Sequence, residues 1–146
     1  MSSTDWLRKN FKEVLLLNDS ASNWLIMLFD IIQTFDDYAD NDKVTREELD
    51  NLIWNTLVLF PTNQFYLNNV MSLTPMVSTM VLKWQASDKV ELEKKHNEVS
   101  FVWRAGYYDI ILFVVALCNG AKFAKENSHL VMSLYGEKYE DYKKEF

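Results

Sequence analysis

Apolar residues between positions 24 and 41 recur at the spacing of one helical face. At about 100° per residue, they spread over one broad side of a helix: Leu25, Leu28, Ile31, Ile32, Phe35, Tyr38 and Ala39. Polar residues gather within an arc of about 120° on the opposite side: Asp30, Gln33, Thr34, Asp37, Asp40 and Asn41. The pattern predicts an amphipathic helix that buries one side in a helical domain.

The remaining sequence also favours an all-helical fold. Three glycines and two prolines in 146 residues leave little material for the hairpin turns of a β fold. Residues 99–125 are predicted to form a long helix whose middle is apolar on every side, so other helices should surround it. We predict a single all-α domain over residues 1–146. It should be a bundle of about five to seven helices, with residues 24–38 and 101–118 packed at its centre.

Several helix boundaries are also predicted. Thr45 and Glu48 form a capping box, in which each side chain accepts a hydrogen bond from the other residue's backbone N–H. Ser20 or Ser22 should cap the helix over residues 24–41, because serine hydroxyls accept from free N–H groups at helix starts. Pro61 should end the helix that starts after Thr45, since proline lacks the N–H that continues a helix.

The acidic charge is concentrated in one segment. Residues 30–50 contain eight acidic side chains: Asp30, Asp36, Asp37, Asp40, Asp42, Glu47, Glu48 and Asp50. Only Lys43 and Arg46 oppose them there, so this segment alone carries the charge of −6 that the whole chain has. Two interpretations are open: the solvated outer face of an amphipathic helix, or a surface that binds a cation or a basic partner.

Composition excludes several classes of partner. The acidic balance without a basic stripe argues against binding of free nucleic acid. The single cysteine, Cys118, excludes an intramolecular disulfide and fits a reducing compartment. The longest apolar run, residues 110–118, is too short to cross a bilayer, and the run at residues 14–17 is too short for a signal peptide. We therefore expect a soluble cytoplasmic protein without membrane contact.

Two patterns suggest magnesium. The sequence DDYAD at residues 36–40 resembles the DDxxD motif with which polyprenyl synthases hold Mg²⁺, although no second acidic motif follows. Asp37 with Asp40, and Glu47 with Asp50, are similar to the paired carboxylates of all-α nucleotide pyrophosphatases, which hold Mg²⁺ between helices. This resemblance implies a metal-dependent enzyme, but no lysine-rich phosphate site lies beside the pairs.

A third pattern suggests calcium. Residues 37–48 resemble the twelve-residue loop of an EF-hand, with Asp37 at the first position, Asn41 at the fifth and Glu48 at the twelfth. Ala39 departs from this pattern at the third position, where an oxygen ligand belongs. Asp42 departs at the sixth, where glycine makes the turn. The candidate ligands for Mg²⁺ or Ca²⁺ are Asp36, Asp37, Asp40 and Glu48.

One further acid stands apart from this segment. Asp109 interrupts the apolar run GYYDIILFVVALC, and an unpaired buried carboxylate is costly, so it should have a partner. The candidates are Tyr107, Tyr108, Lys83 and Arg104. Asp109 is either a satisfied structural acid or a pocket acid with a perturbed pKa.

No complete catalytic set accompanies these acids. The sequence has no nucleophile–base motif, no Gly-rich phosphate loop and no zinc pattern. The leading hypothesis is a non-enzymatic binding or assembly module that presents an acidic patch to a protein partner or to a second copy of itself. The alternatives are a divalent-metal-dependent all-α enzyme and a degenerate EF-hand-like calcium-binding protein.

Overall fold

The computed structural model describes residues 3–146, of which 81% are helical and none lies in a strand. This confirms the predicted all-α class, and the number of helices, seven among the described residues, falls within the predicted range. Internal contacts divide the chain into two compact units, Met1–Val70 and Met71–Phe146. The expectation of one domain over residues 1–146 stays a prediction, as does the packing of residues 24–38 against 101–118.

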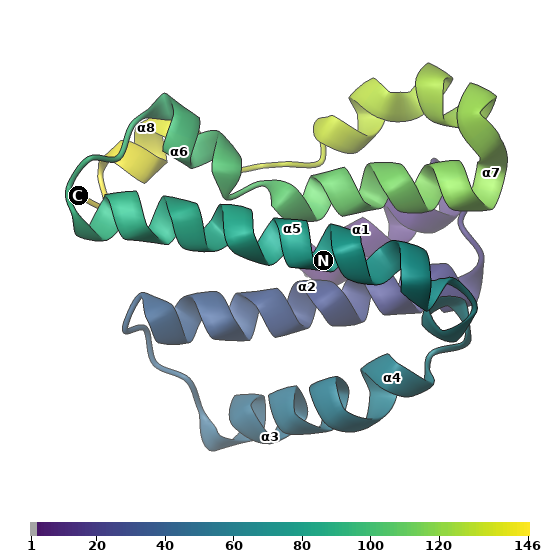
Figure 1. Ribbon diagram of the computed structural model, residues 1–146, viewed down its shortest axis with the longest axis horizontal. Coiled ribbons are helices and arrows are strands. Elements are labelled where there is room, and N and C mark those ends of the chain that lie inside the picture. Colours follow the sequence, from purple (N-terminus) through teal and green to yellow (C-terminus); the bar gives the residue numbers. More distant parts are fainter. Residues whose placement is uncertain (1–2) are drawn as a thin grey trace. The chain divides into compact units, whose positions relative to one another are not determined.

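The first unit is built around α2. Its helices are α1 (Ser3–Glu13), α2 (Asp19–Ala39), α3 (Arg46–Trp54), the π-helical turn η1 (Asn55–Leu59), α4 (Phe60–Thr62) and the start of α5 (Gln64–Leu92). Helix α2 contacts α1, and it also contacts the continuous segment formed by α3, η1 and α4. Figure 1 shows α3 lying beside α2, with a loop joining their ends.

Trp24 anchors the core of this unit. Its side chain is fully buried, and its ring stacks on Tyr66 with centroids 6.0 Å apart. Phe60 and Phe65 contact the same indole at 5.5 and 6.1 Å. Aromatic pairs of this kind stabilise by about 1 kcal/mol beyond the area that they bury. They fix the end of η1–α4 and the start of α5 against α2.

Capping residues set two helix starts, one of them as predicted. Thr45 Oγ1 accepts from Glu48 N at 3.1 Å and Glu48 Oε2 accepts from Thr45 N at 3.2 Å, which confirms the capping box. The predicted cap of α2 is wrong, because Asn18 Oδ1 accepts from Ala21 N at 2.8 Å. Ser20 lies inside α2, where its Oγ instead accepts from Phe65 N at 2.9 Å. That bond ties α2 to α5, which local sequence does not reveal.

Pro61 does not stop its helix where predicted. The helix passes through Pro61 and ends at Thr62. The preceding turn widens, with Phe60 N bonding to Asn55 O in the π-helical pattern. Thr62 Oγ1 also donates to Val58 O at 2.6 Å. A widened turn can absorb the N–H that proline lacks without ending the segment.

The second unit contains the rest of α5, with α6 (Glu98–Trp103), α7 (Gly106–Met132) and α8 (Tyr139–Lys143). The prediction of one helix over residues 99–125 is wrong, because the chain breaks at Arg104–Ala105 and bends at Gly120. The first break brings Gly106 against α5, where an added Cβ would lie 3.0 Å from Met80 Cγ. Gly120 has φ 87° and ψ 167°, a conformation that is almost exclusive to glycine.

The bend at Gly120 changes what the most apolar helix can do. Among the described residues, α7 is long and apolar enough to cross a membrane, judged by length and composition alone. The part before Gly120 begins at Gly106 and, at 1.5 Å per residue, extends only about 21 Å. A bilayer core is roughly 30 Å thick. The expectation of no membrane contact stays a prediction.

Candidate functional site

The predicted acidic residues lie at the junction of α2 and α3. Asp36 and Asp37 belong to the last turns of α2, Asp40 caps its end, and Glu48 lies in the first turn of α3. Partial burial raises the pKa of Asp37, and the nearby negative charges of Asp42, Asp36 and Glu48 raise it further. Acids from both helices therefore repel one another at this junction, which we call the acidic junction (residues 36–50).

The geometry gives no support to a metal centre here. The Glu48 carboxylate already accepts a hydrogen bond from Thr45 N as part of the capping box. Among residues 3–146, no three His, Cys, Asp or Glu side chains are grouped closely enough to hold a metal ion. Because the candidate ligands do not form such a group, no Mg²⁺ or Ca²⁺ chemistry follows from their arrangement. A metal site at Asp36, Asp37, Asp40 and Glu48 stays a prediction.

The outer side of α3 and η1 is apolar and exposed. Neither element contains a buried residue. The exposed apolar side chains are Leu49, Ile53, Trp54 and Leu57, and the last two have 57% and 72% of their surface accessible. Three of them follow at intervals of four residues, so they lie along one side of the helix. We call this surface the α3 apolar face.

The acidic junction borders the α3 apolar face directly. Glu47 and Asp50 belong to the same helix turns as Leu49, and both are exposed. Arg46 offsets part of this charge, since its Nε lies 3.1 Å from Asp50 Oδ1. Both partners of that pair are exposed, so the pair stabilises little. The combined surface is apolar along the helix and negative at the N-terminal end of α3.

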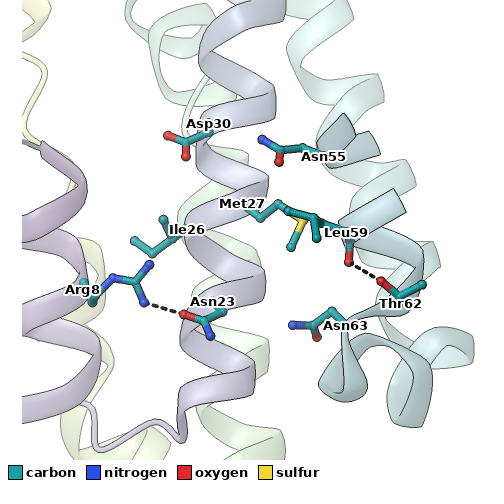
Figure 2. A pocket seen from close by; sticks show the side chains of 9 residues that line it. All are labelled: Arg8, Asn23, Ile26, Met27, Asp30, Asn55, Leu59, Thr62 and Asn63. Atoms are coloured by element: carbon teal, nitrogen blue, oxygen red, sulfur yellow. Dashed lines mark hydrogen bonds between the residues drawn. The ribbon is translucent and has the colours of Figure 1, made fainter. Parts of the chain in front are cut away.

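A groove runs over α2 on another side of the first unit. It has a volume of about 440 Å³ and is lined by Arg8, Asn23, Ile26, Met27, Asp30, Asn55, Leu59, Thr62 and Asn63. Figure 2 shows that α1 contributes Arg8 on one side, whereas Asn55 and Leu59 come from η1 on the other. Burial raises the pKa of Asp30, although the positive charge of Arg8 opposes this effect. We call this feature the α1–η1 groove.

Asp109 has one of its predicted partners. Lys83 Nζ donates a hydrogen bond to Asp109 Oδ2 at 2.7 Å, which joins α5 to α7. Arg104, another candidate partner, instead lies with its Nη1 3.7 Å from Glu91 Oε1 and 3.5 Å from Glu145 Oε2. Asp109 and Arg104 therefore belong to separate ion pairs within the second unit, and both pairs connect helices.

Sequence reasoning missed the α3 apolar face and the α1–η1 groove. The spacing of Leu49, Ile53 and Leu57 marks one helix face, but the same spacing is typical of a buried side. Arg8 and Asn55 meet only after three separate helices have packed together, so no local signal could have found the groove.

Comparison of the chain with protein-family models, with curated proteins and with solved structures finds no match. The site must therefore be interpreted from its own geometry.

Proposed function

We propose that this protein is a binding module whose α3 apolar face, together with the acidic junction, docks a basic amphipathic helix of a protein partner. The supporting observation is the exposure of Trp54 and Leu57 on a helix that buries none of its own residues. Exposed apolar patches rimmed by charged residues are typical of protein-binding surfaces. Tryptophan is also the residue most enriched among those that dominate binding energy.

The charge of the surface supports a basic partner over a second copy of this chain. A symmetric dimer through the α3 apolar face would bring two acidic junctions close together. Asp37 already experiences repulsion from Asp42, Asp36 and Glu48 within a single chain. A cationic helix would relieve this repulsion while its apolar side covers Trp54 and Leu57.

A designed peptide can test this proposal without knowledge of the natural partner. The probe is a fluorescently labelled helical peptide of leucine and lysine, with the leucines on one face. The matched controls are a scrambled peptide of the same composition and a version with glutamate in place of lysine. We expect anisotropy to show binding of the amphipathic lysine peptide alone, weakening as salt screens the charges.

Two sets of variants separate the apolar contribution from the acidic one. Trp54→Ser with Leu57→Ser should abolish binding, and charge reversal of Asp37 and Asp40 to lysine should do the same. All four residues are largely solvent-facing, so the melting temperature should change little. The control is charge reversal of Glu13 and Glu126, which changes the net charge equally at exposed positions elsewhere.

The outcomes discriminate clearly. Binding that survives the loss of Trp54 and Leu57, or that the control reversal weakens equally, would overturn the proposal. A concentration-dependent dimer in sedimentation velocity, abolished by Trp54→Ser, would assign the same face to self-association instead.

A further inference from the structure

The α1–η1 groove presents opposite charges at its two ends. At one end, the Arg8 guanidinium donates a hydrogen bond to Asn23 Oδ1. At the other end lie the carboxylate of Asp30 and the amide of Asn55. Asn23 and Asp30 are seven residues apart on α2, so the two ends are separated by about 10 Å. Figure 2 shows the two charged ends with Ile26, Met27 and Leu59 between them.

Both charged ends retain unused hydrogen-bonding capacity. Arg8 has five N–H donors, of which Asn23 takes one, and the remainder suit a carboxylate. Within residues 3–146, no hydrogen bond from another group reaches the carboxylate of Asp30, and the side-chain amide of Asn55 likewise has none. Asp30 can therefore accept from a cationic N–H group, and the Asn55 oxygen can accept from the same group.

The middle of the groove is apolar. Ile26 is buried and Met27 is half-buried, and both face the groove beside Leu59. A chain of methylene groups laid between the charged ends would cover this surface and gain about 25 cal/mol per Å² of apolar area removed from water. The volume of about 440 Å³ lies within the range of small-molecule sites.

We infer that the α1–η1 groove binds an elongated zwitterion, an ω-amino or ω-guanidino carboxylate. Its carboxylate would lie at Arg8, its cationic nitrogen at Asp30 and Asn55, and its aliphatic chain along Ile26, Met27 and Leu59. A ligand with only one charge leaves the opposite end of the groove unmatched. A short zwitterion cannot reach both ends. Length and charge together thus set the selectivity.

A series of small amphiphiles tests this inference through NMR titration of the full chain. The probe is ω-aminooctanoate, and its matched controls are octanoate, octylamine and the shorter γ-aminobutyrate. We expect ω-aminooctanoate to shift the methyl signals of Ile26, Met27 and Leu59. Each control should bind at least about tenfold more weakly, since each loses one charge-assisted hydrogen bond.

Variants then test each end. Asp30→Asn should weaken binding of ω-aminooctanoate about tenfold but leave octanoate unaffected, whereas Arg8→Gln should leave octylamine unaffected. The controls Lys9→Gln and Glu13→Gln remove exposed charges outside the groove lining and should change neither affinity. Equal binding of octylamine and ω-aminooctanoate, or signal shifts outside the groove, would overturn the inference. An unchanged affinity in Asp30→Asn would do so too. The Proposed function can fail independently, because its variants lie outside the groove lining.

Discussion

Lys83 Nζ lies 2.7 Å from Asp109 Oδ2, and this ion pair joins the middle of α5 to the first turn of α7. The two side chains are 35% and 41% exposed, so water screens the charges but does not surround them. Asp109 also lies near the N-terminal end of α7, where a negative charge is stabilised by the helix dipole. The acid that interrupts the apolar run is thus tied to the neighbouring helix.

Removing either partner of this pair should cost a moderate amount of stability. We expect Lys83→Met and Asp109→Asn each to lower the free energy of unfolding by about 1 kcal/mol, since partly exposed pairs contribute little. Urea denaturation of the two single variants and the double variant gives the coupling energy, which should be about 0.5–1 kcal/mol. Strictly additive single effects would show that the short contact contributes nothing.

Arg104 and Glu91 should give a stronger and pH-dependent effect. Their side chains are only 10% and 11% exposed, so Arg104→Met leaves a buried carboxylate without its cation. At neutral pH the loss should be about 2–4 kcal/mol. Burial already raises the pKa of Glu91, and losing Arg104 removes an effect that lowers it. A raised folded-state pKa favours the folded protein when the carboxyl is protonated, so the deficit should shrink as the pH falls below about 5.

The companion variant separates the two causes of that loss. Arg104→Met combined with Glu91→Gln removes the buried charge, and we expect it to regain part of the stability at neutral pH. Thermal unfolding at neutral and mildly acidic pH measures both effects. A deficit in Arg104→Met that does not change with pH would point to lost packing of the arginine stem instead.

Tyr108 should make the fold sensitive to alkali. Burial raises the pKa of Tyr108 from 10.0 to about 12, and the nearby charge of Glu137 adds to this shift. The neutral phenol is therefore favoured in the folded state, and its contribution to stability is lost as the pH rises from about 10 to 12. Tyr108→Phe should lessen this decline by no more than about 2 kcal/mol. Denaturation at stepwise alkaline pH measures it, and identical slopes would contradict the assignment.

Thr45 and Glu48 distinguish a structural role from a metal-binding one. Thr45→Ala should destabilise by about 1 kcal/mol, because Glu48 N loses the acceptor at 3.1 Å. Glu48→Gln keeps an acceptor for Thr45 N, so it should be nearly neutral. We also expect millimolar Mg²⁺ or Ca²⁺ to leave the melting temperature unchanged. A rise in the wild-type protein that is absent in Glu48→Gln would instead support the metal site, since a bound ion stabilises the folded form.

The parts of the fold that were predictable depend on neighbours within one helical turn. Thr45 and Glu48 are three residues apart, so their capping box can be recognised from sequence alone. Ser20 shows the limit of that reasoning. It has the chemistry of a cap, but Phe65, forty-five residues away, supplies its donor. The choice between Asn18 and Ser20 therefore depended on the packing of α5, which the local pattern does not contain.

The candidate site shows the same division. Lys83 was one of four possible partners of Asp109, and only the relative register of α5 and α7 selects it. The acidic junction was predictable because its charges are contiguous in sequence. Whether the side of α3 bearing Leu57 is covered depends on what packs beside it, which periodicity cannot reveal.

Gly120 determines the route of the last part of the chain. Its backbone torsions turn α7 so that the segment after it runs back within the second unit (Figure 1), where Val131 and Leu134 are buried. Alanine would fit sterically, since no atom lies within 4 Å of the added carbon, but its backbone strongly disfavours that turn. A single methyl group at this position would therefore set two outcomes in competition, the reversal seen here and an uninterrupted rod about 40 Å long. The absence of one side chain keeps the oiliest stretch of the protein folded back as a corner.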